Sequence, residues 1–330
     1  MTNTLRRLTR QRLEVLLGLV AAVAVSVGVV VFPLWKSAVD RNRSQQTAEP
    51  FRIAGNLYYV GGPDVTSFLL TGSDGHVLID GGYARTAPMI IASIAKLGFD
   101  IRDVKVLLNS EPDDDHAGGL AALQQASGAE LWASDASADA IASGGDEGPN
   151  AALPYRALVR VGILRYPAAR VDHRFKDGAT VRVGPIALTA HITGGVTRGC
   201  TSWSFPVRDG GRELQVVRIC SLTVQPGMSL VEPENYPGIR ADFERSFRVL
   251  RSLPVDIFLT AHAREFGRYR KFLARDTAKD PVDPFIDRDG YLRYIDSAEA
   301  RFRELLADQQ RRSSRWGSTL AGAASRWGWQ

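Results

Sequence analysis

The residues best suited to chemistry lie together between Asn109 and Gly119, in the order Asn-Ser-Glu-Pro-Asp-Asp-Asp-His-Ala-Gly-Gly. Four acidic side chains and one histidine fall within six positions, from Glu111 to His116. Carboxylates this close repel each other unless a cation or solvent offsets their charge. A cation site is therefore one interpretation of the segment. The other is a solvated acidic turn in which Asp115 caps the next helix.

The segment follows a predicted strand and precedes a predicted helix. Residues 104–108 form an apolar run typical of a buried strand, whereas residues 118–127 place their apolar side chains on one face of a helix. Short runs of β-forming residues between turn residues identify the other strands, and helical periodicity identifies the other helices. Strands are predicted at 55–61, 66–70, 76–82, 131–133, 180–183, 186–191, 201–207, 214–219 and 256–260, and helices at 87–97, 241–253 and 298–309.

Strands and helices are mixed in both halves of the chain, and polar residues gather where strands end. This pattern predicts an α/β (α+β) fold with two sheets flanked by helices, in which a site lies in the loops at one edge. The segment 144–155 is rich in Gly, Pro, Asp and Asn and is predicted to be a loop.

The N-terminal region indicates where the protein resides. Residues 15–35 form an almost unbroken apolar run of about 20 residues, enough for a helix to cross a bilayer. Four arginines, with no acidic residue among them, precede the run, so residues 1–14 are expected in the cytoplasm. We expect a single-pass signal anchor in the inner membrane, a linker at 36–50, and the remaining domain in the periplasm or outside the cell. The alternative is a cleaved signal peptide that releases the domain into the periplasm.

Composition restricts the remaining possibilities. With 330 residues, 45% of them hydrophobic, the chain can bury one large core. Much of its formal charge of +5 lies at the two ends, and no basic stripe with interleaved aromatic residues crosses the middle, so no nucleic acid partner is expected. The basic tail, 309–330, is predicted to be poorly ordered.

The two cysteines flank a predicted hairpin. The turn Asp209-Gly210-Gly211 separates its strands, and Cys200 and Cys220 are symmetric about Gly210. They could therefore face each other across the strands as a disulfide, which an exported domain would permit. A plain buried thiol is the alternative.

Four blocks along the chain together resemble the metallo-β-lactamase superfamily. They are Asp80-Gly81-Gly82, Asp115 to Gly119, Thr189 to His191 followed by Gly195 to Gly199, and Leu259 to His262. Within the superfamily the chain is most similar to the third subclass of class B β-lactamases, over residues 51–308. The resemblance implies a four-layer αββα sandwich, with metal ions held between loops at one edge of the two sheets.

The resemblance implies one zinc site and the loss of another. Asp115, His116 and His262 stand at the three positions that bind the second zinc ion in the third subclass, and zinc accepts such nitrogen and oxygen ligands. At the positions that bind the first zinc, the chain carries Glu111, Asp113 and Val196 instead of histidines. A valine has no donor atom, so the first site is degenerate and one zinc ion is expected.

Further residues have open roles by the same resemblance. Cys220 lies close to where other members place a bridging Asp or a zinc-binding Cys, so it is a candidate fourth ligand. Glu111 and Asp113 could hold a harder cation, because carboxylates suit magnesium, calcium or manganese. By their position in the chain alone, Ser221 and the loop 144–155 are candidates for binding substrate. The histidines His76, His173 and His191 are not expected to restore the lost ligands.

The expected activity follows from these positions. The resemblance implies a zinc-dependent hydrolase of a small-molecule substrate, with a β-lactam amide as the first choice. Zinc lowers the pKa of bound water, and Asp115 or Glu111 would position that water or manage its proton. One alternative is another hydrolase of the superfamily that acts on a lactone or ester. Another is a catalytically silent, membrane-anchored binding protein with a decayed site.

Overall fold

The computed structural model describes residues 46–145 and 153–326, with side chains described over 46–145 and 157–314. Within these residues, no helix combines the length and the apolar character needed to cross a membrane. The predicted anchor at 15–35 lies outside the described residues, as does most of the predicted linker at 36–50.

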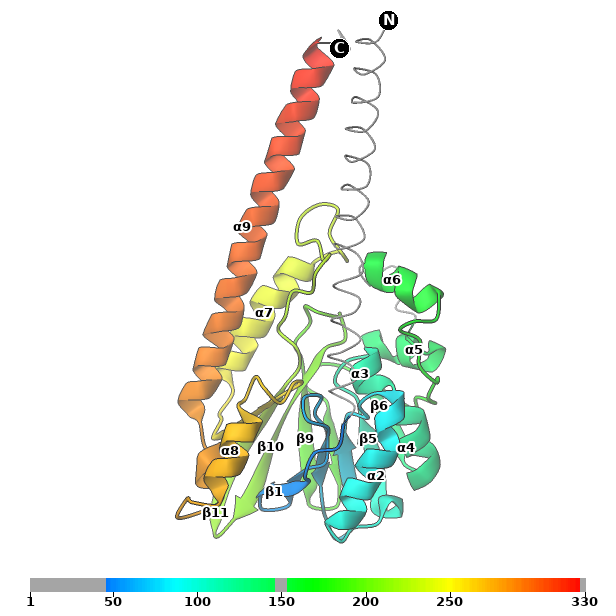
Figure 1. The fold of residues 1–330 in the computed structure, drawn as a ribbon, viewed down its shortest axis with the longest axis vertical. Coiled ribbons are helices and arrows are strands. Elements are labelled where there is room, and N and C mark those ends of the chain that lie inside the picture. The colour runs from blue at the N-terminus through cyan, green and yellow to red at the C-terminus, as the bar shows by residue number, and fades with distance from the viewer. Residues whose placement is uncertain (1–45, 146–152, 327–330) are drawn as a thin grey trace, which may run out of the picture. The chain divides into compact units, whose positions relative to one another are not determined.

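Two β-sheets form the centre of the described fold (Figure 1). The seven-stranded sheet runs in sequence order through β1 (Phe51–Ala54), β2 (Leu57–Tyr59), β3 (Phe68–Leu70), β4 (His76–Ile79), β5 (Val104–Leu108), β6 (Glu130–Ser134) and β7 (His173–Phe175). The five-stranded sheet has the order β12 (Ile257–Thr260), β11 (Arg212–Ile219), β10 (Thr201–Asp209), β9 (Ile186–Ile192) and β8 (Thr180–Val183). Strands β4 to β7 pair in parallel, and so do β11 and β12, so the carboxyl ends of parallel neighbours meet at one edge of each sheet.

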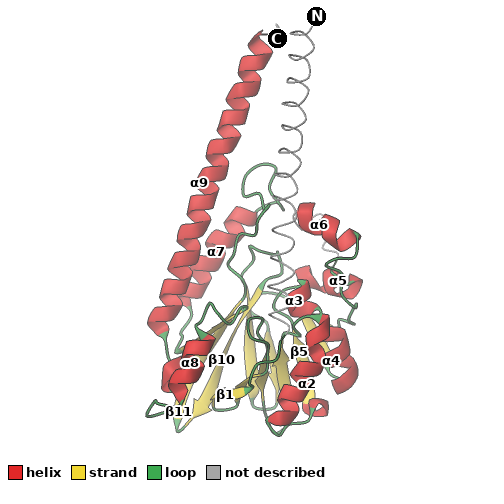
Figure 2. Ribbon diagram, viewed as in Figure 1, coloured by secondary structure: helices red, strands yellow, loops and turns green. Residues whose placement is uncertain are grey.

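Helices accompany both sheets (Figure 2). Those between β4 and β7 are α2 (Ala87–Lys96), α3 (Asp114–Ala117), α4 (Leu120–Ser127), α5 (Asp135–Ser143) and α6 (Leu153–Arg160), and those after β11 are α7 (Ile239–Ser252), α8 (Arg268–Arg275) and α9 (Arg288–Arg326). Successive residues of a strand point to opposite faces of its sheet, so each face of the seven-stranded sheet packs into a different buried cluster. Leu78 belongs to a cluster with Ile90 of α2 and Leu123 of α4, whereas Ile79 belongs to the cluster between the sheets.

The predicted two-sheet fold flanked by helices is confirmed, with differences at individual elements. Strand β5 has the predicted bounds, and the predicted hairpin becomes β10 and β11. Strand β1 was not predicted. Helix α9 begins before the predicted 298–309 and continues to Arg326, through residues predicted to be a poorly ordered tail. No proline interrupts this stretch, and Arg312 pairs with Asp308 one turn earlier at 2.7 Å, which favours a continuous helix.

Two glycine-rich turns fit against each other at the edge of the first sheet. After β4, Asp80 adopts φ 63°, a conformation that few non-glycine residues take. The Gly81 N–H donates to His116 O at 2.8 Å, and the Gly119 N–H donates to Gly82 O at 2.9 Å. A Cβ atom on Gly119 would lie 2.1 Å from Gly81 O, so only glycine allows this approach. The turn after β4 therefore fixes the start of α4.

A buried ion pair connects the two sheets at this turn. The Arg218 guanidinium of β11 donates to the Asp80 carboxylate, and neither side chain is exposed to solvent. The Ser110 N–H also donates to Asp80 Oδ1 at 2.8 Å. Burial alone would raise the pKa of Asp80, but Arg218 and His116 outweigh it and lower that pKa. The carboxylate is therefore held in its charged form.

Replacing one member of this pair should be costly. In Arg218→Met, Asp80 stays buried without its main counter-ion, so we expect the free energy of unfolding in urea to fall by about 3–5 kcal/mol. The double variant Asp80→Asn/Arg218→Met removes both charges and should be more stable than Arg218→Met alone, because no isolated charge remains buried. Equal stability of the single and double variants would contradict a coupled pair.

Candidate metal centre

Three side chains converge at the ends of the parallel strands. Asp115, His116 and His262 each offer one ligand atom, and these atoms lie within 4.8 Å of one another. Asp115 Oδ2 is 3.5 Å from His116 Nε2 and 3.8 Å from His262 Nε2. The His116 side chain is buried, whereas those of Asp115 and His262 are 19% and 20% exposed. The cluster is therefore open to solvent on the side of Asp115 and His262.

Local structure explains this convergence. Asp115 and His116 lie on the short helix α3, which follows β5. The carbonyl of Asp113 accepts the N–H groups of His116 at 3.0 Å and Ala117 at 2.8 Å, which closes the first turn of this helix. His262 follows the end of β12 in the other sheet. Because both strands end at the same edge of the sandwich, residues far apart in sequence become neighbours.

His262 has a carboxylate beside its second ring nitrogen. Its Nδ1 lies 3.2 Å from Asp64 Oδ2. Asp64 is fixed there because the Ala263 N–H donates to its carbonyl at 2.6 Å and Arg264 Nη1 lies 3.0 Å from its carboxylate. Histidines that bind metals usually make such an outer contact, which orients the ring and leaves Nε2 for the ion.

His116 has a similar arrangement, with a different partner and a longer contact. Its Nδ1 lies 3.7 Å from Asp80 Oδ2, the carboxylate that also pairs with Arg218. Its Nε2 faces Asp115, as the Nε2 of His262 does. Both imidazoles therefore point the ligating nitrogen toward one carboxylate and the other nitrogen toward a supporting carboxylate.

The electric field in this cluster is strongly negative. Burial lowers the pKa of His116, but the charges of Asp115 and Glu111 outweigh it and raise that pKa to about 10. At His262, burial also lowers the pKa, but the hydrogen bond to Asp64 and the charge of Asp115 outweigh it. The pKa of His262 is therefore raised. The field that holds these protons would equally attract a divalent cation in their place.

The residues present fit one zinc ion. An aspartate and two imidazoles with a remaining open position form a ligand set typical of catalytic zinc. One buried atom beside it, Glu111 Oε1, has no hydrogen-bond partner in the described part of the chain. The donor set and this unsatisfied oxygen agree with a site that completes its bonding when an ion and water enter.

Glu111, Asp113 and Val196, which stand at the predicted first-zinc positions, have three different environments. Glu111 is buried, with Oε1 3.3 Å from His116 Nε2, and burial raises its pKa to about 7 against the opposing charge of His116. Asp113 Oδ2 instead accepts a hydrogen bond from Gln225 Nε2 at 3.3 Å. Val196 packs in the apolar core. Neither potential metal cluster of the described residues contains Asp113, so a hard-cation site at Glu111 and Asp113 is not supported.

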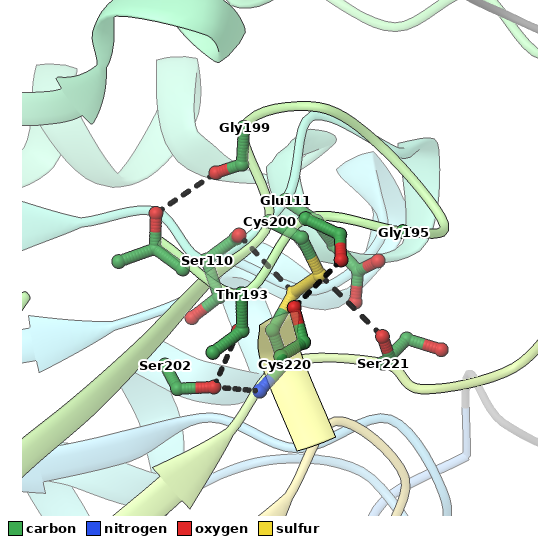
Figure 3. Close-up of a disulfide and its surroundings, with 12 residues drawn as sticks. Ser110, Glu111, Thr193, Gly195, Gly199, Cys200, Ser202, Cys220 and Ser221 are labelled. Atoms are coloured by element: carbon green, nitrogen blue, oxygen red, sulfur yellow. Dashed lines mark hydrogen bonds between the residues drawn. A yellow bond between two sulfur atoms is a disulfide. The ribbon is translucent and has the colours of Figure 1, made fainter. Parts of the chain in front are cut away.

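Cys200 and Cys220 form a disulfide, with Cα atoms 5.8 Å apart (Figure 3). Trp203 pairs with Arg218 across the hairpin, so the bridge joins residues just beyond the paired strands and one position out of register. The predicted bridge is confirmed in this form. The predicted role of Cys220 as a zinc ligand is wrong for the bridged protein, because a disulfide sulfur is not a thiolate.

The remaining histidines lie away from the cluster, as expected. His76 starts β4 and packs its ring edge-on against an aromatic side chain. His173 pairs with Glu130 at 3.0 Å, and His191 shares a hydrogen bond with Ser204 at 2.8 Å. Each therefore has a structural partner of its own.

The two predicted substrate-binding elements, Ser221 and the loop 144–155, stay predictions. Ser221 is mostly buried beside the disulfide, and its hydroxyl accepts the Thr223 N–H at 3.4 Å. Of the loop 144–155, residues 146–152 lie outside the described part of the chain. Sequence reasoning missed Asp64 and Arg218. Arg218 had a signal, since an arginine within the apolar run 216–219 requires a buried partner, whereas no nearby residue indicated Asp64.

Asp64 provides a test of the supporting carboxylates. Asp64→Asn keeps the shape of the side chain but removes the charge beside His262, so zinc affinity should fall by roughly 10- to 100-fold. Competition with a chromophoric zinc chelator measures this change. Asp139→Asn, at an exposed aspartate on α5, is the matched control and should leave the affinity unchanged. An Asp64→Asn protein that binds zinc as tightly as the wild type would refute the supporting role.

Comparison with known proteins agrees with this geometry. A sequence profile of the metallo-beta-lactamase superfamily matches residues 60–262. The chain is similar to native FEZ-1 metallo-β-lactamase from Legionella gormanii, with 37% identity and a TM-score of 0.75 over 80% of this chain and 98% of that one. It is also similar to BJP-1, a subclass B3 metallo-β-lactamase of Bradyrhizobium japonicum, with 33% identity and a TM-score of 0.72 over 81% and 97%. A Cronobacter sakazakii metallo-β-lactamase with a HARLDQ motif gives 36% identity and a TM-score of 0.74 over 82% and 98%. The resemblance predicted from the sequence blocks is confirmed, and the chain belongs to the metallo-β-lactamase superfamily.

Proposed function

We propose that this protein is a metal-dependent hydrolase that opens β-lactam amides with one zinc ion held by Asp115, His116 and His262. The paired arrangement of the two histidines carries the proposal: each Nε2 faces Asp115, and each Nδ1 faces a supporting carboxylate. The similarity to subclass B3 metallo-β-lactamases supplies the substrate class.

The protein groups divide the work in this proposal. Zinc, when bound, would polarise the substrate and lower the pKa of water toward neutrality. Asp115 and the two histidines hold the ion, while Asp64 and Asp80 keep the imidazoles oriented. The partial exposure of Asp115 and His262 leaves an approach for a substrate of small size.

Glu111 is the better of the two candidates for orienting the attacking water. Asp115 faces both imidazoles and is committed to the ion. Glu111 Oε1 lies 3.3 Å from His116 Nε2, at the rim of the same cluster, and has no hydrogen-bond partner among the described residues. A carboxylate oxygen with unused acceptor capacity can accept a hydrogen bond from water and align it for attack.

One observation favours a different class of function. Val196 fills a position where the resemblance calls for a zinc ligand, and it packs in the core. A protein that has lost one metal could have kept the fold for binding alone. The fold also hosts many reactions, so a lactone or ester hydrolase is the alternative within enzymes. The zinc content of the purified protein distinguishes a silent binding protein from either enzyme. Turnover of β-lactam, lactone and ester substrates distinguishes the two enzymes from each other.

Zinc content and turnover should change together. We expect about one zinc ion per chain by elemental analysis and turnover of a chromogenic cephalosporin, with both lost in His262→Ala because a site of three protein ligands is reduced to two. Chelation should abolish turnover and added zinc should restore it. His191→Ala, outside the cluster, is the control and should keep both. Wild-type protein without zinc would support the silent alternative, and zinc with activity only on lactones or esters would reject the amide substrate.

The role of Glu111 makes a separate prediction. Glu111→Gln keeps the size of the side chain but weakens its hydrogen bond to water, so kcat should fall by roughly 10²-fold or more at unchanged zinc content. Steady-state kinetics beside elemental analysis measures both quantities. A kcat equal to that of the wild type would show that Glu111 does not orient the water and would favour Asp115 for this role.

A further inference from the structure

We propose that Cys200, Cys220 and Glu111 form a second zinc site when the disulfide is reduced. This site shares no ligand with the histidine cluster, although Glu111 borders both, and it does not depend on the proposed hydrolase activity. The ligand atoms of the three side chains lie within 4.8 Å of one another, and all three side chains are buried. Two thiolates, one carboxylate and a water molecule make a four-coordinate set that zinc accepts.

Besides the bridge, backbone groups of both cysteines make hydrogen bonds to neighbouring residues (Figure 3). The Thr193 N–H donates to Cys200 O at 2.8 Å, and the Cys220 N–H donates to Ser202 Oγ at 3.0 Å. Two sulfurs that bind one zinc at about 2.3 Å each lie at most about 4.6 Å apart. The Cα separation of 5.8 Å is compatible with that span, so side-chain rotation alone can bring both sulfurs to one ion.

Each sulfur also faces a carbonyl that would retain it as a thiol. Cys200 Sγ lies 3.6 Å from Ser221 O, and Cys220 Sγ lies 3.4 Å from Ser110 O. A thiol is a weak donor to such oxygens. The reduced side chains would therefore stay near Glu111 until an ion binds.

The surroundings offset the charge of the new ligands. Glu111 Oε1 is buried and lacks a hydrogen-bond partner within the described residues, so it has capacity for an ion. The fully buried Arg218 acts on Glu111 with the opposite charge. Two thiolates and a carboxylate around one divalent ion leave one excess negative charge, which a nearby guanidinium reduces.

Reduction of the Cys200–Cys220 disulfide requires a dithiol reductant. The reductant supplies two electrons and two protons: its own sulfurs join in a disulfide, the Cys200–Cys220 bond breaks, and two thiols form. Zinc then displaces both thiol protons to solvent. The same two sulfurs cannot be bridged and bound to zinc at once. The redox state of the pair therefore sets how many ions the chain binds.

The test compares the full chain in its oxidised form with the chain reduced by a dithiol, both freed of reagent without air and equilibrated with zinc. Elemental analysis should give one more zinc ion per chain in the reduced sample. Cobalt substitution should give thiolate-to-cobalt absorption in the near ultraviolet in that sample alone. Equal metal content in both samples, with two free thiols verified by thiol titration, would overturn the proposal.

Variants locate the ion. Cys200→Ser/Cys220→Ser should gain no extra zinc under either condition, and Glu111→Gln should bind the extra ion at least tenfold more weakly. His262→Ala should lose the histidine site yet still gain one zinc on reduction, which separates this proposal from the proposed hydrolase. If the double serine variant does not fold, the cobalt spectrum of the wild-type chain decides, because only sulfur ligation produces that band.

Discussion

The buried carboxylate of Asp80 is the interaction on which the site depends. It pairs with Arg218 from the second sheet, accepts the N–H of Ser110 from the loop after β5, and lies beside His116 Nδ1. An unpaired charge in this position would cost several kcal/mol, so these groups must stay together for the fold to be stable. One carboxylate thus couples the packing of the two sheets to the orientation of a candidate metal ligand.

Contacts within the protein also fix the turn that carries Val196. The turn from Gly195 to Gly199 is held by protein groups: the hydroxyl of Ser134 donates to Gly199 O at 2.9 Å, and that of Tyr236 donates to Gly195 O at 3.3 Å. A Cβ atom on Gly195 would lie 2.6 Å from the Phe243 ring, so the turn is closely packed. Val196 is buried in the same apolar cluster as Phe243. No ion is needed to keep this loop in its place.

The fold was largely predictable because its signals are local or periodic. The apolar run of β5 and the turn between β10 and β11 placed those elements close to their observed bounds. The ligand positions were predictable only through family resemblance, since His262 and Asp115 meet through tertiary packing. The disulfide was foreseen from symmetry about Gly210, but the true register places the bridge beyond the strand ends.

What the sequence could not predict are contacts made across long distances in the chain. Asp64 lies 198 residues from His262, and Arg218 lies 138 residues from Asp80. Neither separation leaves a pattern in a local window, because the pairing follows from how the two sheets close on each other. The extent of α9 was missed for a different reason: its last turns have polar composition, and composition alone favours disorder where backbone geometry permits a helix.

Glu111 connects the two candidate metal sites. Its Oε1 lies 3.3 Å from the ligating nitrogen of His116, and its carboxylate also belongs to the cluster with both sulfurs. In the bridged protein this carboxylate binds no ion at the cysteines, so it can take the proposed role of orienting water at the histidine site. In the reduced protein it would be occupied by an ion and withdrawn from that task. A single carboxylate cannot serve both roles fully, so the two proposals together imply that gaining a second ion at the cysteines changes catalysis at the first, and that the closed disulfide is the state that leaves Glu111 available for hydrolysis.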